Sequence, residues 1–296
     1  MANKKREWKG VTGGSVFGQK AMKIMLAILD VRIGYGIVAL IVPFYMLFAH
    51  KGYIAIYQYF RLRMGYSPVK AFCKTYMNHF VFGQTIIDRF AVYAGRKNFK
   101  VENPDGNLFL EQIESPRSCI IATSHVGNPE LCGYLLSQRT KRINGLIFGG
   151  ETSEVKKNRS VVLTANNVRL IPVSPDMSHL FIINQAFADG EILVVPCDRT
   201  FGSDKTVECD FIGGKADFPV GAFALAQQFD LPVLVMFVVK ISTSTYRIHI
   251  RPIRVADDTD KHKRIEAMTR SFASNLEDIV KKYPEQWFNY YNFWKR

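Results

Sequence analysis

The chain has 296 residues, enough to bury a large core in one domain or in one domain with appended segments. Its hydrophobic fraction of 48% excludes a disordered protein, and its net charge of +13 indicates an anionic partner. A membrane surface or an acidic carrier fits this charge better than nucleic acid, because the sequence has no nucleic-acid-binding motif and its basic residues are spread along the chain. The five cysteines form no CxxC pair, which is typical of free thiols in a reducing compartment.

The N-terminal segment is first basic and then apolar. Basic residues at 4–9 precede an apolar stretch at 21–28 and an uncharged run at 33–49 that contains Pro43. The run of 17 residues is at the short limit for a membrane-spanning helix, and it starts too late for a signal peptide. An interfacial helix pair, a full span and a buried core helix are the three interpretations. We favour helices that lie in or dip into the bilayer, with the N-terminus in the cytoplasm.

Residues 51–95 have the pattern of amphipathic helices. Aromatic residues recur at helical spacing, and basic residues occupy much of the remainder. This stripe is typical of a core, although a surface for acyl chains has the same pattern. We predict that residues 1–97 form a helical membrane-association region.

Residues 98–296 are predicted to form an α/β domain. Apolar runs predict strands at 99–101, 119–123, 145–148, 168–173, 192–197, 233–239 and 246–250. Helical patterns at 108–114, 180–189, 221–229 and 264–282 alternate with these strands. The alternation predicts a mixed, mainly parallel sheet flanked by helices.

The segment that follows the strand at 119–123 carries a candidate general base. Asn128 is a good N-cap, Pro129 suits the first helical position, and Glu130 lies in the first turn. His125 therefore precedes a helix start, with a carboxylate close behind it, an arrangement suited to proton transfer. The alternative interpretation is a capped helix that happens to follow a histidine.

Two other segments follow strand ends, where active sites of α/β sheets gather. Asp198 and Arg199 come directly after the strand at 192–197, and Arg159 belongs to a charged segment after the strand at 145–148. They are candidates for substrate binding. A turn or helix cap is the alternative for Asp198, and a solvated helix face is the alternative for Arg159.

Several blocks together resemble one protein superfamily. The His125-x4-Glu130 motif, with Asn128 inside it, is similar to the first motif of the lysophospholipid acyltransferases. The glutamate, the strand that ends in Asp198-Arg199, and residues 211–216, 219–226 and 283–294 resemble the branch of bacterial late lipid A biosynthesis acyltransferases. Val126 and Pro129 stand where that branch has aromatic residues, a difference that bears on the acceptor pocket.

The resemblance implies acyl transfer from a thioester, either acyl carrier protein or acyl-CoA, to a hydroxyl or amine of a membrane lipid or glycolipid. It implies that His125 is the general base and that Glu130 holds its imidazole, while Asn128, Arg159, Asp198 and Arg199 bind substrate. It also implies the cytoplasmic face of a bacterial inner membrane. No metal or cofactor is expected, since the thioester is a co-substrate. A thioester or ester hydrolase and a non-catalytic lipid- or carrier-binding protein are the alternatives.

Overall fold

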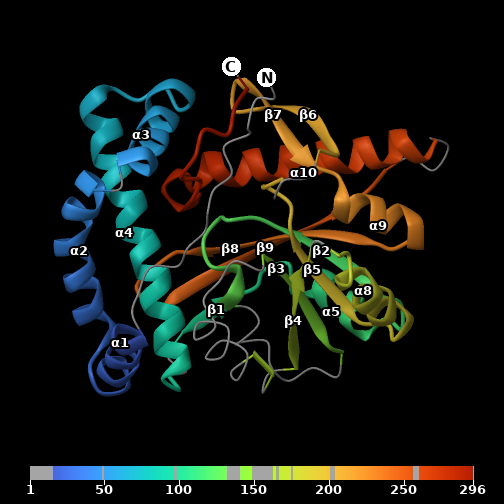
Figure 1. Ribbon diagram of the computed structural model, residues 1–296, viewed down its shortest axis with the longest axis horizontal. Helices are drawn as coiled ribbons and strands as arrows, with labels where there is room; N and C mark the ends of the chain where they lie inside the picture. The colour runs from blue at the N-terminus through green and yellow to red at the C-terminus, as the bar shows by residue number, and fades with distance from the viewer. Residues whose placement is uncertain are drawn as a thin grey trace.

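The computed structural model describes residues 16–48, 50–96, 99–131, 141–148, 163–164, 167–174, 176–200, 204–255 and 260–295. These residues form a central sheet with helices on both faces and a group of N-terminal helices at one side (Figure 1). The predicted fold class is confirmed. The predicted domain boundary falls at residues 97 and 98, outside the described residues, and stays a prediction.

The central sheet has seven strands in the order β1-β9-β8-β2-β5-β3-β4. Neighbouring strands are parallel except for the antiparallel pair β8 and β9. The two central strands β2 and β8 are buried along their whole length, as expected for apolar runs covered on both faces. The strand bounds are β1 (Lys100–Glu102), β2 (Cys119–Thr123), β3 (Ile143–Phe148), β4 (Val168–Val173), β5 (Ile192–Pro196), β8 (Val233–Lys240) and β9 (Thr245–Ile253).

Side chains alternate between two cores, one on each face of the sheet. On β2, Ile120 and Ala122 face one core, and Cys119 and Ile121 face the other. The first core is covered by α8 (His179–Ala188), α9 (Gly221–Phe229) and α10 (Lys261–Lys282). The second is covered by α5 (Gly106–Glu114) and α4 (Pro68–Tyr93). The site at the end of β2 therefore lies between two packed layers.

The N-terminal helices pack on α4 and leave an apolar surface outside. They are α1 (Val16–Ile28), α2 (Val31–Phe48) and α3 (His50–Gln58), followed by the π-helical turn η1 (Tyr59–Arg63). Helix α2 runs beside α4 (Figure 1) and buries Gly34, Tyr35, Val42 and Met46. Its remaining surface exposes large apolar side chains (Ile33, Ile37, Leu40, Ile41, Phe44, Tyr45, Leu47 and Phe48). Within the part of the chain that the structure describes, α2 is the one helix long and apolar enough to cross a membrane.

A buried ion pair joins this helical region to the sheet. Asp88 of α4 binds the ammonium group of Lys240 at the end of β8, and the exposed fractions of the two side chains are 0% and 6%. The hydroxyl groups of Tyr35 on α2 and Tyr246 on β9 also donate to the Asp88 carboxylate. One carboxylate therefore links α2, α4, β8 and β9.

The sequence pattern did not predict the hairpin formed by β6 (Thr206–Phe211) and β7 (Gly214–Pro219). Ile212 and Gly213 form its two-residue turn, and both have positive φ, 45° and 66°. Positive φ at both turn positions is typical of hairpin turns, but isoleucine rarely adopts it, so the residue types concealed the turn. The last described part of the chain is the closing segment, residues 284–295, which begins with the short 3-10 turn η2 (Pro284–Gln286). It packs against the hairpin and η1.

Candidate active site

The carboxyl ends of two neighbouring parallel strands bring His125 and Asp198 together. Strands β2 and β5 pair in register to their last residues, Thr123 and Pro196. The pairing continues one step further, since the Cys197 amide donates to the Thr123 carbonyl at 2.8 Å. The residues of the candidate site follow directly, with His125 after β2 and Asp198 after β5.

Gly127 lets the chain after His125 pass close to β8. Its φ is 63°, and a Cβ atom there would lie 2.0 Å from the carbonyl oxygen of Val238. The same carbonyl accepts the Asn128 amide at 2.8 Å, and the Gly127 amide donates to the Gln286 carbonyl. Only glycine tolerates both this φ and this approach. The turn that carries His125 is thus held between β8 and the closing segment.

His125 is bound twice by the carboxylate of Asp198. The imidazole Nδ1 lies 2.8 Å from Oδ1, and the backbone amide of His125 donates to Oδ2 at 2.9 Å. The indole N–H of Trp287 also donates to Oδ2, at 3.4 Å. The Asp198 side chain is 2% exposed and that of His125 is 30% exposed. The carboxylate is therefore buried behind a histidine that reaches the surface.

The electrostatics of the pair define the state of the imidazole. Burial tends to raise the pKa of Asp198. The positive charge that His125 carries at low pH, the hydrogen bonds from His125, and the charge of Arg199 together outweigh burial and lower the pKa to about 2. An ionised carboxylate only accepts hydrogen bonds, so Nδ1 of the neutral imidazole carries the proton. Burial lowers the pKa of His125, Arg199 lowers it further, and Asp198 opposes both. His125 is thus neutral near pH 7, with its lone pair on Nε2.

Arg199 is buried beneath the closing segment. Its Nη2 donates to the Phe288 carbonyl at 2.9 Å, and its guanidinium lies 5.8 Å from the ring centre of Tyr291. The Phe288 amide in turn donates to the His125 carbonyl. Arg199 thus connects the end of β5, where Asp198 lies, to Phe288, which also contacts the His125 backbone.

The structure places the Glu130 carboxylate against α4. Its carboxylate accepts hydrogen bonds from Tyr93 at 2.8 Å and from Arg89 at 3.2 Å, both on α4. The carboxylate on Nδ1 of His125 is that of Asp198, and the predicted orienting role of Glu130 stays a prediction.

Asn128 also faces α4. It is 3% exposed, and its side-chain amide donates to the Thr85 carbonyl at 3.4 Å. The described contacts of Asn128 are thus with protein groups, and its role in substrate binding stays a prediction. Arg159 lies outside the described residues. No cluster of three metal-ligating side chains occurs within the described ranges.

Three participants were not singled out from the sequence. Arg89 and Tyr93 lie one helical turn apart on α4, where they belonged to a general aromatic and basic pattern. Trp287 belonged to a segment known only by resemblance. The signal that could have paired Asp198 with His125 is the adjacency of their strands, since side chains at neighbouring carboxyl ends meet.

Comparisons with known proteins indicate a family for the chain. The sequence model of one family, described as bacterial lipid A biosynthesis acyltransferase, matches residues 96–296. A comparison with curated proteins finds no match. Among solved structures, the chain is similar to the 1-acyl-sn-glycerophosphate acyltransferase PlsC of Thermotoga maritima, with 14% identity and a TM-score of 0.36 over 87% of this chain and 97% of that chain.

Proposed function

The chain belongs to the family of bacterial lipid A biosynthesis acyltransferases, and on this basis we propose that it moves a fatty acyl group from a thioester to a membrane lipid. The donor is acyl carrier protein or acyl-CoA, and the acceptor is a hydroxyl or amine of a lipid or glycolipid. The net charge of +13 supports an acidic donor and an anionic membrane surface.

The proposed reaction uses Nε2 of His125 as the general base. It takes the proton of the acceptor hydroxyl while that oxygen attacks the thioester carbonyl carbon. The tetrahedral intermediate collapses, the carbon–sulfur bond breaks, and the imidazolium returns the proton to the leaving thiolate. The products are an ester and a free thiol. Asp198 stabilises the imidazolium and keeps the proton on Nδ1, the role of the carboxylate in a catalytic triad.

The observation that carries this proposal is the 2.8 Å contact between His125 and the buried Asp198. In the proposed reaction Glu130 has a positioning role. The hydrogen bonds that its carboxylate accepts from Arg89 and Tyr93 hold the helix start after His125 against α4. Arg199 holds the closing segment over the site.

The test is an assay of the full chain in detergent micelles with a radiolabelled acyl thioester, with and without a lipid acceptor. We expect labelled lipid only when the acceptor is present, and none from His125→Ala. Release of labelled fatty acid at the same rate without acceptor would identify a hydrolase. Transfer by His125→Ala at the wild-type rate would contradict the proposal.

We also propose that the N-terminal helices lie in one leaflet of the bacterial inner membrane, on its cytoplasmic face. Helix α2 buries one side on α4 and exposes apolar side chains on the other, which is the pattern of an interfacial helix. Because α4 also carries Asp88, bound to the sheet through Lys240, α2 is attached along its length to the α/β domain. This attachment favours an interfacial position over a full span. The basic residues at 4–9, which support the cytoplasmic side, lie outside the described residues.

A further inference from the structure

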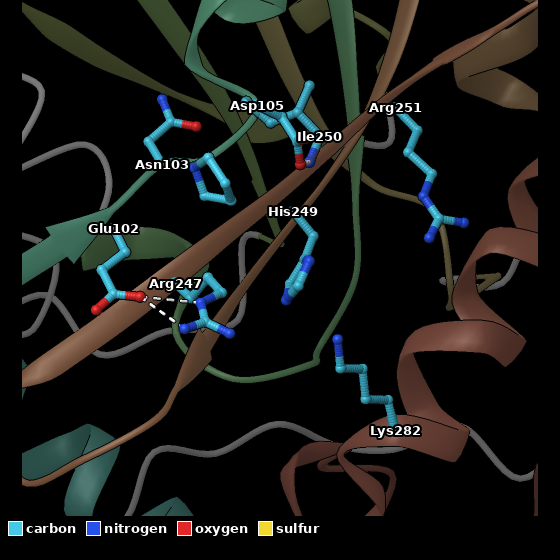
Figure 2. A pocket seen from close by; sticks show the side chains of 9 residues that line it. Glu102, Asn103, Asp105, Arg247, His249, Ile250, Arg251 and Lys282 are labelled. Atoms are coloured by element: carbon cyan, nitrogen blue, oxygen red, sulfur yellow. Dashed lines mark hydrogen bonds and ion pairs between the residues drawn. The ribbon is translucent and has the colours of Figure 1, made fainter.

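A polar hollow lies at the edge of the sheet formed by β1 and its neighbour β9 (Figure 2). Its volume is about 680 Å³, within the range of roughly 300–1,000 Å³ that is typical of small-molecule sites. Its lining comes from β1, the turn before α5, β9 and the last residue of α10, and it includes neither His125 nor Asp198. We call this hollow the β9 pocket.

The alternation of β9 places three basic side chains in the β9 pocket. Tyr246, Ile248 and Ile250 are buried in the core on one face of the strand. Arg247, His249 and Arg251 therefore share the other face, and all three line the pocket. The ammonium group of Lys282 points toward the imidazole of His249 from the facing end of α10 (Figure 2).

Of the carboxylates around the β9 pocket, Glu102 and Asp278 pair with arginines, and Asp105 accepts the Ile250 amide at 3.4 Å. Arg247 binds Glu102 at 2.8 and 3.0 Å, so these two charges neutralise each other. Arg251 binds Asp278 at 3.1 Å, but both side chains are 60% exposed and such a pair is weak. Lys282 makes no ion pair with any described residue.

His249 lies where these charges meet. Burial lowers its pKa and Lys282 lowers it further, Asp105 raises it, and Arg247 and Arg251 again lower it. Besides burial, three basic groups thus lower the pKa of His249 and one carboxylate raises it. The groups that face His249 from the surrounding elements are Glu102, Asp105, Arg247, Arg251, Asp278, Lys282 and Tyr283.

Nε2 of His249 is buried and has no hydrogen-bond partner among the described residues. Buried polar atoms in native proteins nearly always have a partner, and those that lack one call for an explanation such as a bound ion. A second, smaller hollow of about 50 Å³ also touches His249, Arg251 and Lys282, so the three side chains stand around open space.

We propose that the β9 pocket binds the phosphate group of a phosphorylated small molecule through His249, Arg251 and Lys282. The three terminal oxygens of a phosphate monoester match three separate donors, whereas a carboxylate has only two oxygens. The hollow is larger than a phosphate group, which leaves room for the organic part of the ligand. The site is separate from the proposed acyl transfer and does not depend on it.

The test is an NMR titration of the full chain in neutral micelles, with the His249 imidazole signal assigned from His249→Gln. Bound phosphate adds negative charge beside the imidazole and favours its protonated form, so inorganic phosphate should raise the His249 pKa in a saturable way. Lys282→Gln should weaken phosphate binding about tenfold, because a charged hydrogen bond is lost. Lys281→Gln is the matched control, since Lys281 is the preceding lysine and pairs with Glu277. We expect it to bind as the wild type does.

Two further ligands distinguish the source of the phosphate. Glycerol phosphate should act like inorganic phosphate if the ligand is soluble. A response to vesicles that contain phosphatidylglycerol, without a response to either soluble probe, would overturn the assignment to a small molecule in favour of a lipid headgroup. No response to any probe, or an equal loss in Lys281→Gln and Lys282→Gln, would also overturn the proposal.

Discussion

Nδ1 of His125 lies 2.8 Å from Oδ1 of Asp198, although the two residues are 73 positions apart in the chain. The contact depends on the parallel pairing of β2 with β5, which ends both strands at the same edge. Asp198 also accepts the His125 backbone amide, so the carboxylate holds both the ring and the turn that carries it. The carboxylate that contacts Nδ1 is therefore supplied by the neighbouring strand.

We predict that Asp198→Asn lowers acyl transfer by about 10³- to 10⁴-fold, because an amide no longer fixes the proton on Nδ1 or stabilises the imidazolium. Glu130→Gln should cost less, since the described contacts of Glu130 are with Arg89 and Tyr93. Single-turnover rates with a labelled thioester, beside circular dichroism of each variant, measure both effects. A larger loss in Glu130→Gln than in Asp198→Asn would return the orienting role to Glu130.

Local patterns in the sequence predicted the seven strands of the central sheet, but they predicted neither the β6–β7 hairpin nor the pairing at the site. The continuous apolar runs predicted β2 and β8, and capping residues predicted the helix start at Pro129. The partner of His125 could not be read from spacing, because the partner depends on strand order. A carboxylate five residues away is also a plausible partner until the direction of the turn is known.

The same limit applies to contacts between distant segments. Asp88 and Lys240 are 152 positions apart, and neither stood out within its own helix or strand. A lone charge in an apolar run gives no sign of its partner. Long-range pairing therefore had to come from the structure, whereas fold class followed from periodicity.

The depressed pKa of His125 predicts the pH dependence of transfer. A general base works in its unprotonated form, so the acid limb of kcat/KM should have its midpoint below 6.5, the ordinary pKa of histidine. Arg199→Gln removes a positive charge that lowers this pKa, so the limb should move to higher pH. A pH profile of kcat/KM for both proteins measures the shift. Movement to lower pH in Arg199→Gln would contradict the assignment of the limb to His125.

We predict that Gly127→Ala destabilises the fold by roughly 3 kcal/mol and displaces the His125 turn, because the new Cβ would meet the Val238 carbonyl in a left-handed backbone conformation. Gly221→Ala is the control, since a Cβ there meets no atom within 4 Å. It should leave stability within about 0.5 kcal/mol or improve it slightly. Urea unfolding in micelles, read by tryptophan fluorescence, compares the two. Equal stability of both variants would argue against the close approach.

The buried pair of Asp88 and Lys240 should behave differently when one or both partners change. Lys240→Met leaves a buried carboxylate without its cation and should cost about 3–5 kcal/mol of unfolding free energy. Adding Asp88→Asn should restore part of this, because one of the two tyrosines can still donate to the amide oxygen and the amide NH2 can donate to the hydroxyl of the other. Arg270→Gln, which breaks an exposed pair with Glu266, should change stability by less than about 0.5 kcal/mol. A double-mutant cycle with no coupling would show that the pair is not formed.

The exposed face of α2 should determine membrane binding. Phe44 and Phe48 are 63% and 86% exposed there, and burying one such side chain contributes about 1.5–3 kcal/mol, so each change to serine should weaken vesicle binding roughly tenfold or more. Phe181→Ser is a control of the same chemistry, because Phe181 is 80% exposed on α8, across the sheet from α2 (Figure 1). Co-sedimentation with vesicles should show loss of binding for Phe44→Ser with Phe48→Ser and wild-type binding for Phe181→Ser. Equal losses would mean that α2 is not the surface that binds the membrane. In a separate protease experiment, cleavage of the residues before and after α2 from opposite sides of a vesicle would instead identify a full span.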